Sequence, residues 1–158
     1  MHEVKRVSAA GLFSFVSELI KQGQTAKIPV SGNSMYPFLR DGIDSVEFTK
    51  GSFDQIKKGD IVLIQRTNGY YVMHRVFRKY KDCFYMVGDA QQWIEGPLFP
   101  EQLVAIVNTI WRKEKRILCS NTWLRILTKI WLILRPFRYF IFKVYRKVRK
   151  IFSFHSKE

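Results

Sequence analysis

The chain of 158 residues leaves room for one domain with a hydrophobic core and one short appendage. Its 47% hydrophobic and 25% charged residues are typical of a globular protein, and it contains no internal repeat or low-complexity linker. The net charge of +14 is uneven: residues 1–110 hold 13 Lys and Arg against 11 Asp and Glu, whereas residues 111–158 hold 14 against 2. The basic character therefore belongs to the tail and does not describe the rest of the chain.

Cysteine usage argues against the simplest metal and disulfide sites. Cys83 and Cys119 lie far apart and lack the spacing of metal ligands, so we expect both to be reduced and structural. The sequence predicts no zinc site, no disulfide and no cofactor.

Residues 1–26 predict a short amphipathic helix. Leu12, Val16 and Leu19 recur at roughly helical spacing. Glu18 interrupts this apolar run, which is too short and too charged for a secretory signal or a membrane span.

From residue 27 onward the pattern changes to β-strands. Several short segments are rich in Val, Ile, Phe and Tyr and are bounded by turn residues. They are residues 27–31, 44–50, 60–66, 70–77, 83–88 and 103–111. Asn68-Gly69 between two of them is a hairpin signal, because both turn positions tolerate a positive φ. We predict a mainly β fold: an antiparallel, barrel-like or rolled domain over residues 27–112, with a helix before it and a helical tail after it.

The segment SGNSMYPFL presents Ser34 on a tight turn after the first predicted strand. Gly32 and Asn33 favour the turn, and Pro37 prevents a long helix from following it. Such a turn offers an exposed hydroxyl beside backbone N–H groups that no strand uses, which is what acyl transfer requires. An ordinary Ser/Gly/Asn turn is the alternative interpretation.

His74 lies in the predicted strand YYVMHRVF, where Val72, His74 and Val76 point to one face of the sheet. An imidazole has an unperturbed pKa of about 6.5, so its neutral form can accept the proton of Ser34 near neutral pH. By itself, a histidine in a strand is more often a structural residue.

Four motifs in one order link these residues: SGNSMYPFL with Ser34, KKGDIVLI after it, HRVF with His74, and VGDA with Asp89. Together they resemble the type I signal peptidase family over roughly residues 27–107. The histidine resembles the branch typical of the endoplasmic reticulum and archaea. The bacterial branch has a lysine there, as do the self-cleaving SOS-type repressors, whose serine motif is also similar. The resemblance implies a serine endopeptidase with Ser34 as the nucleophile and His74 as the general base.

A Ser-His mechanism also needs an acid that orients the imidazole. Asp89 and Glu95 are both candidates. In the histidine branch this acid is an Asp a few residues beyond the Gly-Asp motif, and here Glu95 stands six residues beyond it. Asp89 would then brace the turn that carries the serine. The backbone N–H of Ser34, with Ser31 or Asn33, is the candidate for stabilising the oxyanion.

The tail, residues 113–158, predicts two helical stretches divided by Pro136. In the second stretch, apolar residues recur at helical spacing on one side and basic residues take the other, as in a helix lying in an anionic membrane interface. The candidate membrane-binding residues are Lys143, Arg146, Lys147, Lys150, Trp123, Trp131, Phe137 and Phe140. Arg125 and Lys129 disfavour a membrane span over residues 117–134. A helix packed on a partner protein and a nucleic-acid-binding arm are the alternatives, and the apolar content argues against the second.

These observations predict a serine endopeptidase of the signal-peptidase type that removes a leader or signal segment from precursor polypeptides. We expect it at an anionic membrane surface, the plasma membrane of a prokaryote, without a nucleic-acid partner. The side of the membrane stays open. A catalytically inactive membrane-binding module with the same fold and a self-cleaving repressor-like protein are the alternatives.

Overall fold

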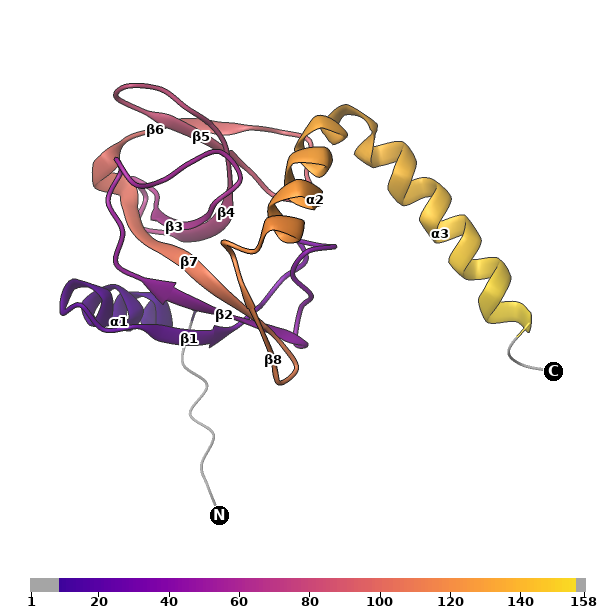
Figure 1. Ribbon diagram of the computed structural model, residues 1–158, viewed down its shortest axis with the longest axis horizontal. Helices are drawn as coiled ribbons and strands as arrows, with labels where there is room; N and C mark the ends of the chain where they lie inside the picture. The colour runs from indigo at the N-terminus through magenta and orange to yellow at the C-terminus, as the bar shows by residue number, and fades with distance from the viewer. Residues whose placement is uncertain (1–8, 156–158) are drawn as a thin grey trace, which may run out of the picture.

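The computed structural model describes residues 9–155, in which the predicted strand segments form one antiparallel sheet (Figure 1). The strands are β1 (Ala26–Pro29), β2 (Asp44–Thr49), β3 (Ile61–Gln65), β4 (Tyr71–Lys79), β5 (Phe84–Val87), β6 (Glu95–Leu98), β7 (Leu103–Arg112) and β8 (Lys115–Leu118). The α-helices are α1 (Ala9–Lys21), α2 (Thr122–Ile133) and α3 (Arg138–His155). Short 3-10 turns occur at Pro100–Gln102 and Arg135–Phe137. The prediction of a mainly β fold is confirmed.

The strands follow the order β1-β2-β7-β3-β4-β5-β6, and β8 pairs with β7. Within the described residues the two end strands, β1 and β6, do not pair with one another, so the sheet is open. The predicted barrel-like closure is therefore not confirmed. The hairpin at Asn68-Gly69 joins β3 to β4, in the register Val62 to His74.

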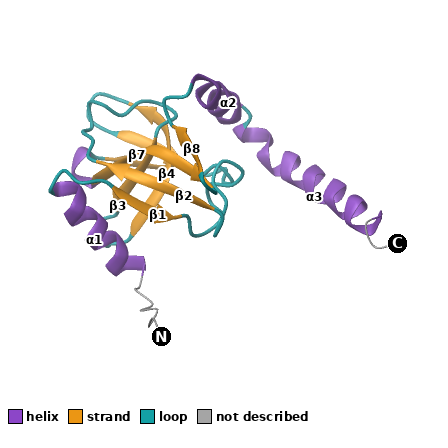
Figure 2. Ribbon diagram, turned by 60° about the horizontal axis from the view of Figure 1, so that its bottom comes forward, coloured by secondary structure: helices purple, strands orange, loops and turns teal. Residues whose placement is uncertain are grey.

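Two apolar clusters make up the core, one on each side of the sheet. Along β2, buried residues such as Val46 and Phe48 alternate with half-buried ones, because successive side chains point to opposite faces. Helix α1 covers the first cluster with Val16 and Ile20, which are fully buried. The N-terminal helix is thus part of the hydrophobic core of the sheet (Figure 2).

The first part of the tail is strand β8 of the sheet, and the rest is the helices α2 and α3. Strand β8 extends the sheet past the predicted boundary at residue 112. The side chain of Asn121 then accepts a hydrogen bond from the Leu124 N–H and caps α2. Helix α2 packs against the β domain through Thr128 and Leu132. Helix α3 extends beyond the sheet (Figure 1), and it contacts the β domain through the loops that follow β1 and β5.

Candidate functional site

Ser34 lies in the loop between β1 and β2, which we call the serine loop (residues 31–40). Met35 and Leu39 anchor this loop in the first core cluster and leave Ser34 half-buried beside them. The Gly32 N–H donates to Asp41 Oδ1 at 3.1 Å, and the Ala90 N–H donates to the Ser34 carbonyl at 2.8 Å. The serine loop is therefore held at both its start and its centre.

The second of these contacts joins Ser34 to the acidic turn (residues 88–91), which follows β5. A Cβ atom at Gly88 would lie 2.7 Å from the Ser34 carbonyl oxygen and 2.5 Å from Gln91 Oε1. No side chain fits at these distances, so glycine at this position allows the acidic turn to approach the backbone of Ser34.

His74 lies on β4, next to the strand that leads into the acidic turn. Arg75 pairs with Val87 in the antiparallel register of β4 and β5. The residue before Arg75, which is His74, therefore lies level with the residue after Val87, which is Gly88. Because Gly88 contacts the Ser34 backbone, the backbones of Ser34 and His74 both lie next to this glycine, and within the described structure no hydrogen bond joins their side chains.

The His74 ring is 5% exposed, and its Nδ1 atom is buried without a hydrogen-bond partner in the described structure. Oε2 of Glu95 lies 3.9 Å from this nitrogen, which is too long for a hydrogen bond but close enough for electrostatic interaction. Arg66 holds the Glu95 carboxylate through two hydrogen bonds, of 2.5 and 2.7 Å. Burial lowers the pKa of His74, which the nearby Glu95 carboxylate opposes and Arg66 reinforces. The imidazole is thus neutral near pH 7, as a general base must be.

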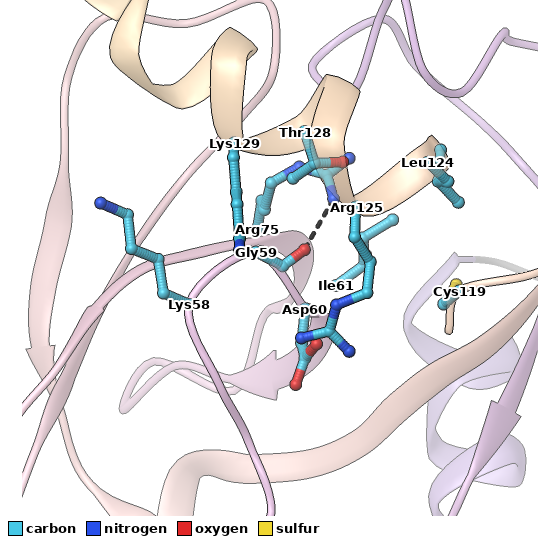
Figure 3. Close-up of a pocket in the computed structure, with 10 residues that line it drawn as sticks. All are labelled: Lys58, Gly59, Asp60, Ile61, Arg75, Cys119, Leu124, Arg125, Thr128 and Lys129. Carbon is cyan, nitrogen blue, oxygen red and sulfur yellow. Dashed lines mark hydrogen bonds between the residues drawn. The ribbon is translucent and has the colours of Figure 1, made fainter. Parts of the chain in front are cut away.

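Asp89 has a different environment. It is fully buried, and both its carboxylate oxygens accept hydrogen bonds from Arg75, at 2.8 and 2.6 Å. Arg75 also donates to the carbonyl of Gly59, in the turn beneath α2 (Figure 3). Asp89 is therefore engaged in an ion pair that braces the acidic turn, whereas Glu95 is the acid beside the imidazole.

Of the three oxyanion candidates, the Ser34 backbone N–H has the most suitable position. No backbone or side-chain acceptor within the described structure engages this N–H or that of Met35. Ser31 and Asn33 are exposed, and the carbonyl of Asn33 accepts the Tyr36 N–H, so Asn33 closes the turn. Two adjacent free N–H groups are a suitable donor pair for a developing oxyanion.

An apolar groove of about 420 Å³ opens beside Ser34. It runs between α1, β1 and the start of β4 and contains Ser34 and Met35 from the serine loop together with Ile28, Val46 and Met73. Among the residues that the structure describes, no charged side chain lines it. Such a groove suits an extended apolar peptide segment lying across the serine.

The tail contacts the acidic turn directly, which we did not predict. The indole N–H of Trp131 donates to the Asp89 carbonyl at 2.9 Å. Arg138 is fully buried and donates to the carbonyls of Gly88 and Gln91, both at 2.8 Å. Burial lowers the pKa of Arg138 to about 10. Trp131, expected at a membrane surface, is instead half-buried against the site.

The other candidate membrane-binding residues lie on the surface of the tail. Trp123 is 74% exposed and Phe140 is 65% exposed. Phe137, Lys143, Arg146 and Lys147 are exposed as well, and Lys150 is among the residues whose side chains lie outside the described structure. Over the described residues, no helix has the length and apolar character required to cross a bilayer.

Metal and thiol chemistry receive no support from the geometry. The described part of the chain contains no group of three or more His, Cys, Asp or Glu side chains that is arranged to bind a metal ion. Cys83 and Cys119 are free thiols, and burial raises the pKa of Cys119 to about 11.

No protein-family model matches this chain, and no curated protein matches it significantly. The likeness of its four motifs to the signal peptidases therefore stays a prediction, and its function has to be argued from the site itself.

Three arginines complete the site, and sequence reasoning missed all of them. Arg66 holds Glu95, Arg75 holds Asp89, and Arg138 binds the acidic turn from the tail. Of the three, only Arg75 could have been identified from the sequence, because it follows His74 directly in a predicted strand that is otherwise rich in apolar residues. Such an arginine requires a buried acid as its partner.

Proposed function

We propose that this protein is a serine endopeptidase of the signal-peptidase type, with Ser34 as the nucleophile, His74 as the general base and Glu95 as the acid that orients it. The observation that carries the proposal is the packing of the Ser34 backbone on Gly88, level with a buried histidine that faces Glu95. A serine, a neutral imidazole and a carboxylate are the parts of an acyl-transfer site.

The reaction follows from these roles. Ser34 Oγ attacks the substrate carbonyl, and its proton passes to Nε2, the ring nitrogen of His74 that does not face Glu95. The negative oxygen of the tetrahedral intermediate is stabilised by the N–H groups of Ser34 and Met35. The imidazolium returns the proton to the leaving amine as the peptide bond breaks. A water molecule, deprotonated by His74, then hydrolyses the acyl-enzyme and restores the serine.

Glu95 assists by stabilising the imidazolium. Its carboxylate needs to approach His74 Nδ1 by roughly 1 Å to form a hydrogen bond of ordinary length. Catalytic hydrogen bonds are often long before substrate binds, so the observed distance is compatible with this role. Arg66 holds the carboxylate in place beside the ring through its two hydrogen bonds.

The apolar groove supports a preference for small or apolar residues in the substrate, since a charged side chain placed there would find no partner. An apolar leader segment lying extended across Ser34 satisfies this requirement. The expected substrates are precursor polypeptides that carry such a leader.

The tail supports an association with an anionic membrane surface, where such precursors are presented. Large apolar side chains are exposed along α2 and α3, including Trp123, Ile133 and Phe140, and Lys143 and Lys147 lie among them. Exposed apolar surface next to lysines suits an interfacial helix. The plasma membrane of a prokaryote is the expected location.

The test is cleavage of a fluorogenic small-residue peptide, together with labelling of the protein by a fluorophosphonate probe. We expect the parent protein to cleave and to be labelled, and folded Ser34→Ala and His74→Ala variants to lose cleavage. Folding is checked by circular dichroism. A folded parent protein that neither cleaves nor reacts is a non-catalytic module, and equal cleavage by parent and variants overturns the assigned residues.

A further inference from the structure

A second groove lies on the other side of the serine loop. It has a volume of about 790 Å³ and runs between Asn33 and Tyr36 of the serine loop, the segment 90–93 after β5, and one face of α3. Tyr139, Phe142, Arg146 and Arg149 form the wall on α3. We call it the aromatic–arginine groove.

Aromatic contacts fix the α3 wall against the serine loop. The Tyr36 ring lies 6.0 Å from the ring of Phe142, and the Tyr36 hydroxyl donates to that of Tyr145 at 3.3 Å. The ring of Trp131 on α2 supports Phe142 from behind, at 5.9 Å. The groove is therefore already formed in the absence of any occupant.

The charged side chains that are known to line the groove are all positive. Over the described part of the chain, its charged lining residues are Arg146 and Arg149, without any Asp or Glu side chain. Both arginines are exposed, and neither forms an ion pair within residues 9–155. Arg146 Nε donates to the Phe142 carbonyl at 3.3 Å, but neither guanidinium group has a carboxylate partner in the described structure. Two such groups beside exposed aromatic rings favour an occupant that carries carboxylates and flat or apolar side chains.

The position of the groove indicates what this occupant is. Ser34 and Met35 line the apolar groove, whereas Asn33 and Tyr36, on either side of them in the chain, line the aromatic–arginine groove. A polypeptide held extended in the first groove and crossing Ser34 therefore continues over the second. One half of this polypeptide then lies in the uncharged apolar groove, and the other half lies on the positively charged aromatic–arginine groove.

The groove shares Arg146 with the candidate membrane-binding residues, but the rest of its wall on α3 lies on another side of the helix from Phe140 and Lys147. At about 100° per residue, Tyr139, Phe142, Arg146 and Arg149 fall on one side of the helix. Phe140, Val144 and Lys147 fall on the opposite side, away from the serine loop. The face that lines the groove is thus distinct from the face that carries the exposed apolar residues.

We infer that the aromatic–arginine groove binds an acidic, aromatic-containing segment of the substrate polypeptide, on the opposite side of the scissile bond from the segment in the apolar groove. This inference rests on the proposed peptidase function for the identity of the occupant. The aromatic–arginine groove would thus be a second determinant of substrate specificity, and α3 of the tail supplies its arginines.

Binding to the Ser34→Ala protein tests the groove without relying on cleavage. The probe is a short fluorescein-labelled peptide of alternating glutamate and tyrosine, and fluorescence anisotropy gives its Kd. We expect an Arg146→Gln, Arg149→Gln double variant to bind about tenfold more weakly. The matched control is Lys143→Gln, Lys147→Gln, which removes the same charge from α3 outside the groove and is expected to leave the Kd nearly unchanged.

Three further measurements test which chemical feature of the probe the groove recognises. Arg146→Lys, Arg149→Lys keeps the charge and is expected to restore part of the affinity, because the planar fork is lost but the attraction stays. A peptide of alternating lysine and tyrosine is expected not to bind. Vesicles of phosphatidylglycerol and phosphatidylcholine distinguish a lipid headgroup from a carboxylate as the anionic ligand.

Several outcomes overturn the inference. The first is that the folded protein does not bind the probe. The second is that the arginine double variant and the lysine double variant lose the same amount of probe affinity. The third is that the arginine double variant loses vesicle binding while its probe affinity is unchanged. A parent protein that cleaves nothing while the groove binds the probe contradicts the peptidase proposal and the identity of the occupant as a substrate, but not the binding of acidic peptides by the groove. A parent protein that cleaves the small-residue peptide while the arginine pair leaves probe binding unchanged contradicts the groove alone.

Discussion

Nδ1 of His74 lies 3.9 Å from Oε2 of Glu95, at a buried position where this nitrogen has no hydrogen-bond partner among the described residues. A buried, unpaired ring nitrogen next to a carboxylate is costly for the folded protein unless it has a role. The proposed role is the stabilisation of the imidazolium that forms when Ser34 loses its proton. The first two predictions concern this pair.

Glu95→Gln is expected to lower kcat by about 10²-fold or more, with a smaller effect on KM, because the imidazolium loses its counter-charge. The Glu95 carboxylate raises the pKa of His74, so its removal lowers this pKa further. The acid limb of the pH–rate profile should therefore move to lower pH. The measurement is kcat/KM against pH. Glu101→Gln, an exposed acid beyond β6, is the control, and an unmoved acid limb would contradict the assignment.

The burial of His74 predicts a pH dependence of folding stability. Its pKa in the folded state is below the ordinary value of about 6.5, so the unfolded chain binds more protons between the two values. The stabilising contribution of neutral, buried His74 is therefore fully present above about pH 6.5, and the free energy of unfolding falls as the pH drops toward the folded-state pKa. Urea denaturation at a series of pH values measures it. His74→Gln should flatten this part of the profile, and an unchanged slope would show that other groups cause it.

Gly88→Ala is expected to displace the serine loop. The new Cβ would lie 2.7 Å from the Ser34 carbonyl oxygen, and relief requires the backbone to move. We expect a loss of about 1–3 kcal/mol in the free energy of unfolding and a disproportionate loss of fluorophosphonate labelling. Gly69→Ala is the control: its φ of +85° strains alanine by about 1 kcal/mol, but nothing lies within 4 Å of the added atom. If both variants label equally fast, the approach at Gly88 is not functional.

Asp89→Asn leaves the buried Arg75 guanidinium without its counter-charge. The expected cost is about 3–5 kcal/mol in the free energy of unfolding, because an unpaired buried charge cannot regain water. The control is Glu18→Gln, which breaks an exposed pair with Lys21 at 3.7 Å and should cost less than about 0.5 kcal/mol. Urea denaturation compares the two. A cost as small as that of the control would show that Arg75 finds another partner.

Trp131→Phe tests whether the tail supports the acidic turn. The substitution keeps an aromatic ring beside Phe38 and Phe142 and removes the hydrogen bond to the Asp89 carbonyl. We expect about 1 kcal/mol of destabilisation and a lower labelling rate in solution, without lipid present. Trp123→Phe, at an exposed position of α2, should change neither. A variant that loses only vesicle binding would mean that Trp131 acts at the membrane instead.

The strands show how much the sequence determines locally. Each of the six predicted segments overlaps one of the strands β1–β5 and β7, because alternating Val, Ile and aromatic residues favour a half-buried extended chain. The two missed strands lack that signal: β6 reads EGPL, and β8 reads KRIL with exposed basic residues. Both form because a neighbouring edge, β5 or β7, offers them unpaired N–H and C=O groups.

From the sequence alone, turn chemistry, residue type and the four motifs predicted Ser34 as the nucleophile, His74 as the base and Asp89 or Glu95 as the acid. Only the tertiary structure shows that Glu95 lies beside His74 whereas Asp89 pairs with Arg75, because these contacts join different strands. The same holds for the tail, whose apolar and basic pattern predicts a surface helix but not that Trp131 and Arg138 turn inward. Local pattern decides which backbone conformation a segment prefers. Which buried charge meets which partner is decided by contacts between segments far apart in the chain.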